Sequence, residues 1–260
     1  LLKGNNVLLS STRPDVIREI HREYLAAEAD IIETNTFNST SISMQDYKMS
    51  HLAGEINRAA VKLAREAADE FTKLTPEKPR FVAGSIGPTN KTASMSPRVE
   101  EPLYRAAPFD HFKSAYKEQI FALVEGGADL LLIETIFDTL NAKAAIFAAE
   151  EVAAETGINT PIMLSVTLSD KAGRTLSGQT LGAFVASVSH ANPLLIGLNC
   201  SLGAAELKPY VKELGKAAPF YISTYPNAGL PNQLGEYDVP HEKMASQIRE
   251  FIDHSLINVV

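Results

Sequence analysis

Cys200 has the widest chemical repertoire of any residue in this sequence, and it is the only cysteine among the 260 residues. It closes an apolar run in the stretch LLIGLNCSLG, just before a turn-forming Ser-Leu-Gly. A lone cysteine at a strand end can be a small buried hydrophobic residue, a nucleophile or one ligand of a metal ion. A nucleophile needs a base beside it, and none of the six histidines closely follows a predicted strand. From the residues alone, packing is the usual role of such a cysteine, with metal binding and a nucleophile as the functional alternatives.

Other polar side chains also follow apolar runs. Glu134 ends the run DLLLIET, where a buried carboxylate is costly unless a structural or substrate group pairs with it. Asn35 and Thr36, in ETNTFN, are either strand-end caps or the lining of a substrate pocket. Asn227, in YPNAG, is either a turn residue or a contact in a site. Asp138 is better explained by the free N–H groups of a helix start than by catalysis.

Alternating helices and strands must position these residues. Apolar residues recur at helical spacing, and nearly continuous apolar runs predict strands that are buried on both faces. The predicted helices span residues 14–30, 51–71, 111–128, 139–157, 180–191, 204–218 and 240–256. The predicted strands span residues 30–37, 80–88, 129–135, 161–168, 194–200, 220–225 and 257–260.

This order leaves an open doubly wound sheet or a closed (β/α)8 barrel. No Gly-x-Gly-x-x-Gly turn supports a dinucleotide fold, and the count of seven helix-then-strand units favours the barrel. Such a barrel starts with a strand and finishes with a helix, so residues 1–260 read as one incomplete domain. We expect it to lack the first strand and the segment after the eighth. Active sites of barrels lie at the C-terminal strand ends, where all of these polar residues fall.

Composition narrows the class of function. The formal net charge of −7 offers no basic surface for nucleic acid. No apolar run approaches the roughly 20 residues that span a bilayer, so no membrane partner is expected. One cysteine cannot form an internal disulfide, which fits a reducing, cytoplasmic compartment.

Six segments carry a resemblance that runs from end to end: ADIIETNTFNST, GSIGPTNKTASMSP, EGGADLLLIETIFDTLNAKAA, GRTLSGQT, GLNCSLG and PNAGLPNQLGEYD. They resemble the homocysteine-binding barrel of the cobalamin-dependent methionine synthases, a branch of the homocysteine S-methyltransferase family. The resemblance implies a truncated (β/α)8 TIM barrel and a zinc ion held by three cysteine thiolates. Cys200 matches one thiolate. The other two belong to a Gly-Gly-Cys-Cys-Gly segment after the eighth strand, which these 260 residues do not contain.

The same resemblance assigns the remaining candidates. It implies that Glu134 binds the α-amino group of homocysteine and that Asn35 and Thr36 line the substrate pocket. It implies that Asn227 lies near the metal and takes the fourth zinc position when substrate is absent. No residue of the sequence is predicted to act as a catalytic acid, base or nucleophile.

The function that follows is a methyltransferase module. The resemblance implies that homocysteine binds zinc as a thiolate and accepts a methyl group from methylcobalamin, giving methionine. The cobalamin-binding and folate-binding domains would belong to the same parent polypeptide. Alternatives are another donor, such as betaine or S-methylmethionine, or an inactive fragment of such an enzyme. A barrel aldolase or lyase would need a Schiff-base lysine on a strand, and the strand runs contain none.

Overall fold

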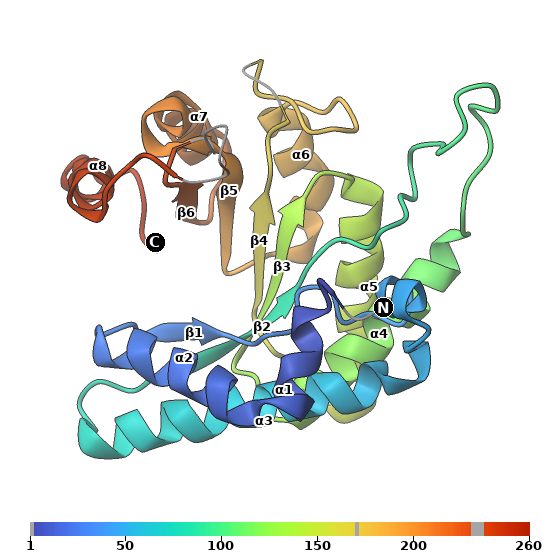
Figure 1. The fold of residues 1–260 in the computed structure, drawn as a ribbon. Helices are drawn as coiled ribbons and strands as arrows, with labels where there is room; N and C mark the ends of the chain where they lie inside the picture. The colour runs from blue at the N-terminus through green and yellow to red at the C-terminus, as the bar shows by residue number, and fades with distance from the viewer. Residues whose placement is uncertain (1–2, 170–171, 230–236) are drawn as a thin grey trace. The chain divides into compact units, whose positions relative to one another are not determined.

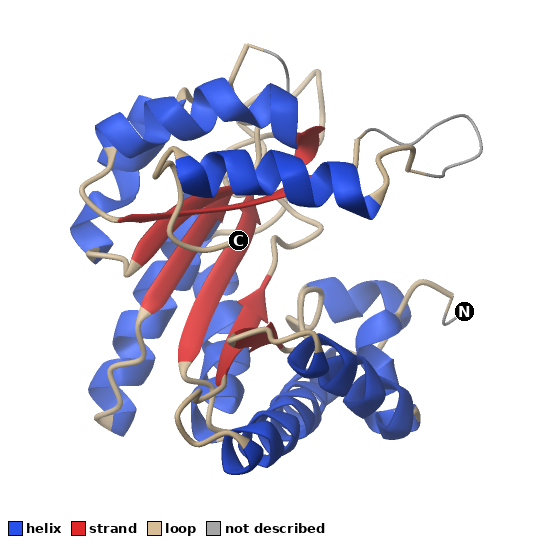
Figure 2. Cartoon of the chain, turned by 90° about the vertical axis from the view of Figure 1, so that its left-hand side faces the viewer, coloured by secondary structure: helices blue, strands red, loops and turns tan. Residues whose placement is uncertain are grey.

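Helices and strands alternate along the chain (Figures 1 and 2) in a computed structural model that describes residues 3–169, 172–229 and 237–260. Along the sheet the strands follow the order β1 Ile31–Glu33, β2 Phe81–Ile86, β3 Leu130–Ile136, β4 Ile162–Val166, β5 Leu195–Gly203 and β6 Tyr221–Asn227. The α-helices are α1 Leu9–Thr12, α2 Pro14–Ala26, α3 Ala53–Leu74, α4 Phe109–Glu125, α5 Thr139–Thr156, α6 Leu181–Val188, α7 Ala204–Ala217 and α8 His241–Asp253. Short 3-10 helices are η1 Asn6–Leu8, η2 Ser43–Tyr47, η3 Ser50–Leu52 and η4 Ser189–Ala191.

The alternation confirms the predicted α/β class. Within the described ranges the sheet has six strands, so an eight-stranded barrel stays a prediction. None of the helices in these ranges combines the length and apolar character that a membrane span requires.

The chain divides into two compact units. The first unit comprises the residues up to Leu132 together with Leu140–Pro161. The second comprises Ile133–Thr139 together with the residues from Ile162 onward. Strand β3 begins in the first unit and ends in the second, so its C-terminal end belongs with β4, β5 and β6.

The first unit is built on β1 and β2, which pair in parallel with Ile32 opposite Val82. Helix α3 packs against both α2 and α4 (Figure 1). Its apolar face, which includes Ile56 and Ala60, is buried, as the helical spacing of the sequence predicts. At the start of β3, the carboxylate of Asp129 accepts a hydrogen bond from the Val82 N–H at 2.7 Å, which ties β3 to β2.

Strand β1 is shorter than the predicted strand over residues 30–37, because it ends at Glu33. Beyond it the backbone turns on itself: the Thr36 N–H donates to the Thr34 carbonyl at 2.9 Å, and the Ser39 N–H donates to the Thr36 carbonyl at 3.1 Å. Thr, Ser and Asn side chains offer the backbone local partners that compete with the strand ladder. The polar composition that suggested a binding segment is therefore also what ends the strand.

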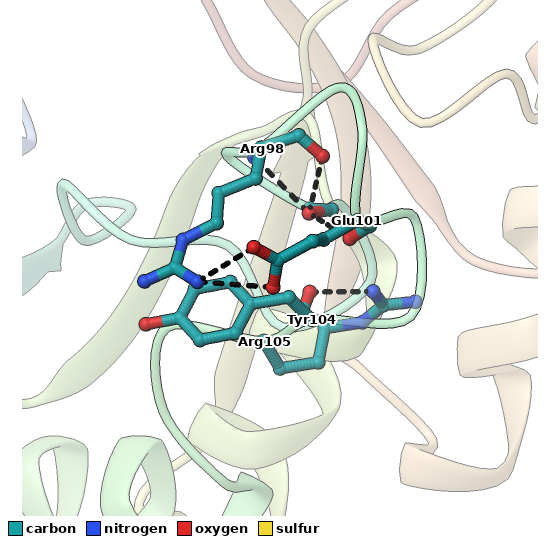
Figure 3. A network of polar contacts seen from close by, with 5 residues as sticks. Arg98, Glu101, Tyr104 and Arg105 are labelled. Carbon is teal, nitrogen blue, oxygen red and sulfur yellow. Dashed lines mark hydrogen bonds and ion pairs between the residues drawn. The ribbon is translucent and has the colours of Figure 1, made fainter.

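The connection between β2 and α4 is held together by its own side chains. Figure 3 shows Arg98 donating to both carboxylate oxygens of Glu101, each at 3.0 Å. The same guanidinium lies 3.7 Å from the centroid of the Tyr104 ring. Arg105 donates to the Tyr104 carbonyl at 2.8 Å. Exposed ion pairs of this kind contribute little to stability, so their effect is to order the connection locally.

The second unit carries β4, β5 and β6, which pair in parallel with Ile196 of β5 opposite both Leu164 and Ile222. The predicted last strand, residues 257–260, is reduced to one parallel bridge between Ser223 and Val259. Nearby, the Asn258 N–H donates to the Ile222 carbonyl at 2.7 Å. The final segment therefore lies beside β6, as its apolar run predicts.

The close approach of β5 and β6 requires glycine at position 197. A Cβ built there would collide with Ser223 Oγ and lie 2.7 Å from the Ser223 carbonyl oxygen. We expect Gly197→Ala to lower the free energy of unfolding by about 2 kcal/mol, a typical cost of overpacking. Chemical denaturation checks this.

Ser223 supplies the matched control. Its buried Oγ has no hydrogen-bond partner among the described residues, so we expect Ser223→Ala alone to be neutral or stabilising. Combining it with Gly197→Ala should recover part of the lost stability. Equal losses with and without Ser223→Ala would contradict the steric explanation.

His21 on α2 gives the first unit a pH-dependent stability. Its side chain is buried, its Nε2 has no partner among the described residues, and burial lowers its pKa from 6.5 to about 4. The unfolded chain therefore binds a proton at higher pH than the folded chain does. Stability is fully present above pH 6.5 and falls as the pH drops toward 4, by up to about 3 kcal/mol.

Denaturation of the wild type and of His21→Gln between pH 7 and pH 4 checks this. We expect the variant to lose part of the pH slope, whereas the same change at the exposed His51 should leave the slope intact. Parallel curves for the wild type and His21→Gln would contradict it.

Candidate functional site

Three residues with left-handed backbone mark the strand ends of the second unit. Thr135 near the end of β3 has a φ of +55°, and Cys200 and Ser201 on β5 have φ of +57° and +64°. The register of β5 against β6 shifts between Asn199 and Gly203, so β5 bulges at this point and continues three residues past its predicted end. Positive φ is rare for residues other than glycine, most of all for a β-branched threonine. Such strain tends to gather at functional sites.

The Asn199 side chain joins these strand ends. Its Oδ1 accepts from Ser165 Oγ at 2.7 Å and from the Thr135 N–H at 3.2 Å. Its Nδ2 donates to Thr135 Oγ1 at 2.9 Å and to Cys200 Sγ at 3.1 Å. Asn199 is 1% exposed, so one buried amide connects β3, β4 and β5.

Cys200 lies where the sequence places it, at the C-terminal part of a buried strand. It is half-buried, which leaves part of the residue accessible, and its sulfur accepts the Asn199 hydrogen bond. A buried packing residue has no need of this hydrogen bond or of the left-handed backbone. Both features distinguish Cys200 from a residue that only packs, and its role as a metal ligand stays a prediction.

Glu134 precedes the strained Thr135 and is 7% exposed. Tyr225 on β6, which is half-buried, lies with its hydroxyl 3.5 Å from Glu134 Oε2. This contact is long for a hydrogen bond from a hydroxyl group. Burying a carboxylate is costly unless it is paired, and the predicted role of Glu134 toward a substrate ammonium group stays a prediction.

Asn227 is the last residue of β6 and is half-buried. Its Cα pairs with Gly203, where β5 ends beyond the bulge. The segment PNAGLPNQLGEYD extends from here into residues 230–236, which lie outside the described residues. Strand β6 therefore continues two residues past its predicted end at Tyr225 and includes Asn227, whose role toward a metal stays a prediction.

Asn35 and Thr36 belong to the first unit. Thr36 is fully buried, and its hydroxyl donates to the Ser85 carbonyl at 2.6 Å. Asn35 donates to the Asn6 carbonyl at 3.0 Å and to Ser10 Oγ at 3.1 Å. Asn35 also lines a cavity of about 480 Å³ together with polar residues that include Asn6, Asn38, Asp46 and Tyr47. The structure therefore ties Thr36 into the strand ends, whereas Asn35 borders open space.

The donor set does not complete a zinc centre. Zinc sites in proteins use at least three protein ligands, usually Cys, His or carboxylate groups. Within the described ranges no three such groups come together, and the sequence holds one cysteine. Cys200 and Asn227 suit two positions of such a centre, and their role toward zinc stays a prediction.

The sequence predicts that Asn199 lies at a strand end, but it does not indicate a functional role for Asn199. It also indicates no role for Thr135, Ser165 or Tyr225. One signal was available for Asn199, because an amide that interrupts the apolar run of a buried strand needs several partners. No sequence signal indicates the positive φ of Thr135, since threonine is among the residues least suited to it.

Known proteins resemble this chain in sequence and in fold. A model of the homocysteine S-methyltransferase family matches residues 2–260. The metallated form of the homocysteine methyltransferase MmuM from Escherichia coli is 23% identical, with a TM-score of 0.69 over 85% of this chain and 75% of that chain. The oxidized form of MmuM is 20% identical, with a TM-score of 0.75 over 96% and 80% of the two chains. The solved structures therefore share the fold.

Proposed function

The chain belongs to the homocysteine S-methyltransferase family, and on that basis we propose that it binds homocysteine and prepares its thiol to accept a methyl group. The observation that carries the proposal is a buried carboxylate, Glu134, directly before Thr135, which the Asn199 side chain links to the half-buried sulfur of Cys200. An amino thiol carries an ammonium group that can pair with the carboxylate and a thiol that can share a metal ion with the cysteine sulfur.

Glu134 is proposed to bind the substrate ammonium group. A carboxylate in a site of low polarity pairs best with a cation that also satisfies its hydrogen bonds. The Tyr225 hydroxyl, near Oε2, would orient the carboxylate rather than neutralise it. Asn35 and Thr36 remain predicted substrate contacts, on the strength of the sequence resemblance.

Cys200 is proposed to be one ligand of a zinc ion, with Asn227 as the amide beside it. Zinc supplies Lewis acidity, which lowers the pKa of a thiol that it binds. A free alkyl thiol resembling cysteine has a pKa of about 8.5 and is mostly protonated at neutral pH. Methyl transfer forms the sulfur–carbon bond of methionine as the bond between the methyl carbon and its donor breaks, so the acceptor thiol must first lose its proton.

Methylcobalamin is the proposed donor, carried with a folate-binding domain on the same parent polypeptide. This part rests on the six segments that resemble the cobalamin-dependent branch. We also propose that residues 1–260 are one domain, part of a (β/α)8 barrel, and that the protein works in the cytoplasm.

The experiment offers homocysteine and one donor at a time to the complete, zinc-loaded protein and measures methionine. Methylcobalamin, S-methylmethionine and betaine are the donors. We expect methionine from methylcobalamin alone. Methionine from another donor only would contradict cobalamin use but keep the acceptor role. No methionine from any donor, with no homocysteine binding, would contradict the proposed function. The 260-residue chain in parallel shows whether this part is active alone.

A further inference from the structure

We propose that Asn199 is a positioning residue that fixes the distance between the ammonium-binding carboxylate of Glu134 and the sulfur of Cys200. Asn199 would thereby select homocysteine over amino thiols of different chain length. This inference rests on the proposed function, because it assigns a role to a residue that contacts neither end of the substrate.

Every hydrogen-bonding group of the Asn199 side-chain amide has a partner. Two donors reach Asn199 Oδ1 within 3.2 Å, and a third, Thr167 Oγ1, lies at 3.5 Å. Both Nδ2 hydrogens have acceptors, Thr135 Oγ1 at 2.9 Å and Cys200 Sγ at 3.1 Å. A buried amide with every group paired has one orientation, because any other would leave polar groups unsatisfied.

The hydrogen bonds of Asn199 reach residues beside both proposed substrate-binding groups. Asn199 holds both the N–H and the hydroxyl of Thr135, the residue that follows Glu134 and has a φ of +55°. It also precedes Cys200, whose φ is +57°, and donates to its sulfur. Strained residues persist only where surrounding contacts over-determine them. One side chain therefore restrains the backbone beside the carboxylate and the position of the sulfur together.

Two substrate contacts held at a fixed distance recognise the length of the chain between the amino group and the sulfur. In homocysteine two methylene groups separate the α-carbon from the sulfur, whereas cysteine has one. A site whose ammonium and sulfur contacts cannot adjust must bind one of the two with strain. One methylene typically changes discrimination by about 10- to 200-fold. A site whose two contacts move independently would adapt to either amino thiol and lose most of that difference.

The experiment measures dissociation constants of homocysteine and of cysteine on the complete, zinc-loaded protein by calorimetry. The variants are Asn199→Ala, which removes every side-chain hydrogen bond of this residue, and Asn199→Asp. The aspartate has the same shape and can still accept from Ser165 and Thr135, but it cannot donate to Cys200. It keeps the test open if Asn199→Ala does not fold.

Thr224→Val is the matched control, since it removes one buried hydrogen bond, to the Leu198 carbonyl at 3.0 Å, and leaves the Asn199 contacts in place. The proposal expects the preference for homocysteine over cysteine to fall about tenfold in both Asn199 variants and to stay at the wild-type value in Thr224→Val.

A purely structural role would weaken both thiols alike and keep their ratio. The inference is overturned if Asn199→Asp keeps the wild-type ratio of the two dissociation constants, or if Thr224→Val loses as much of that ratio. In either case, homocysteine binding by the wild type still supports the proposed function. A wild type that binds neither thiol overturns both.

Discussion

Replacing Cys200 by serine should lower homocysteine methylation by the complete protein about a thousandfold, because the hydroxyl group of serine is a poor zinc ligand. The substitution is nearly isosteric and keeps the backbone of the bulge. The measurement is the initial rate of methionine formation together with the zinc content of the purified variant. Both should fall, while the free energy of unfolding of the 260-residue chain should stay close to that of the wild type.

Ser201→Ala is the matched control for Cys200→Ser. Ser201 is the next residue of the same bulge and shares its left-handed backbone, with a φ of +64°. A variant that disturbs only the bulge should keep most of the rate and the zinc. If Cys200→Ser keeps more than a tenth of the rate with stoichiometric zinc, Cys200 is a packing residue after all.

Replacing Glu134 by glutamine should raise the dissociation constant of homocysteine about a hundredfold. The change keeps the shape of the side chain and removes the charge that pairs with the substrate ammonium. Removing one partner of a buried ion pair typically costs about 3 kcal/mol, which corresponds to that factor. Calorimetry on the complete protein measures it. The methylation rate at saturating homocysteine should change far less, because this contact is made equally before and during methyl transfer.

Glu213→Gln on α7 supplies the control for Glu134→Gln, since Glu213 is exposed and has no place in the cluster. It should leave the dissociation constant unchanged. Stability separates the two possible roles of Glu134. A carboxylate kept for structure would lower the free energy of unfolding when neutralised, whereas one kept for substrate would leave it unchanged or raised.

The strand ends that carry Glu134 and Cys200 are predictable from the sequence, because their apolar runs are long enough to fix buried strands. The polar residue that closes each run then has to lie at the C-terminal end of the sheet. Residues 34–38 show the limit of this reasoning. Their side chains hydrogen-bond locally, so β1 ends at Glu33 and Thr36 satisfies the Ser85 carbonyl.

The connections between strand ends are not predictable in this way. Asn199 meets Thr135 and Ser165 across 64 and 34 residues of chain, and nothing in the local sequence selects those partners. The bulge of β5 is hidden for a similar reason. Cys200 and Ser201 adopt a left-handed backbone that glycine normally provides, and tertiary contacts rather than local preference hold them there.

A crystal structure of the complete protein with zinc and homocysteine bound is the most direct measurement. We expect the substrate ammonium about 3 Å from the carboxylate of Glu134. Its sulfur should lie on the same metal ion as the sulfur of Cys200. Homocysteine bound away from both side chains, or a metal ion bound without Cys200, would contradict the proposal that these two strand ends hold the methyl acceptor.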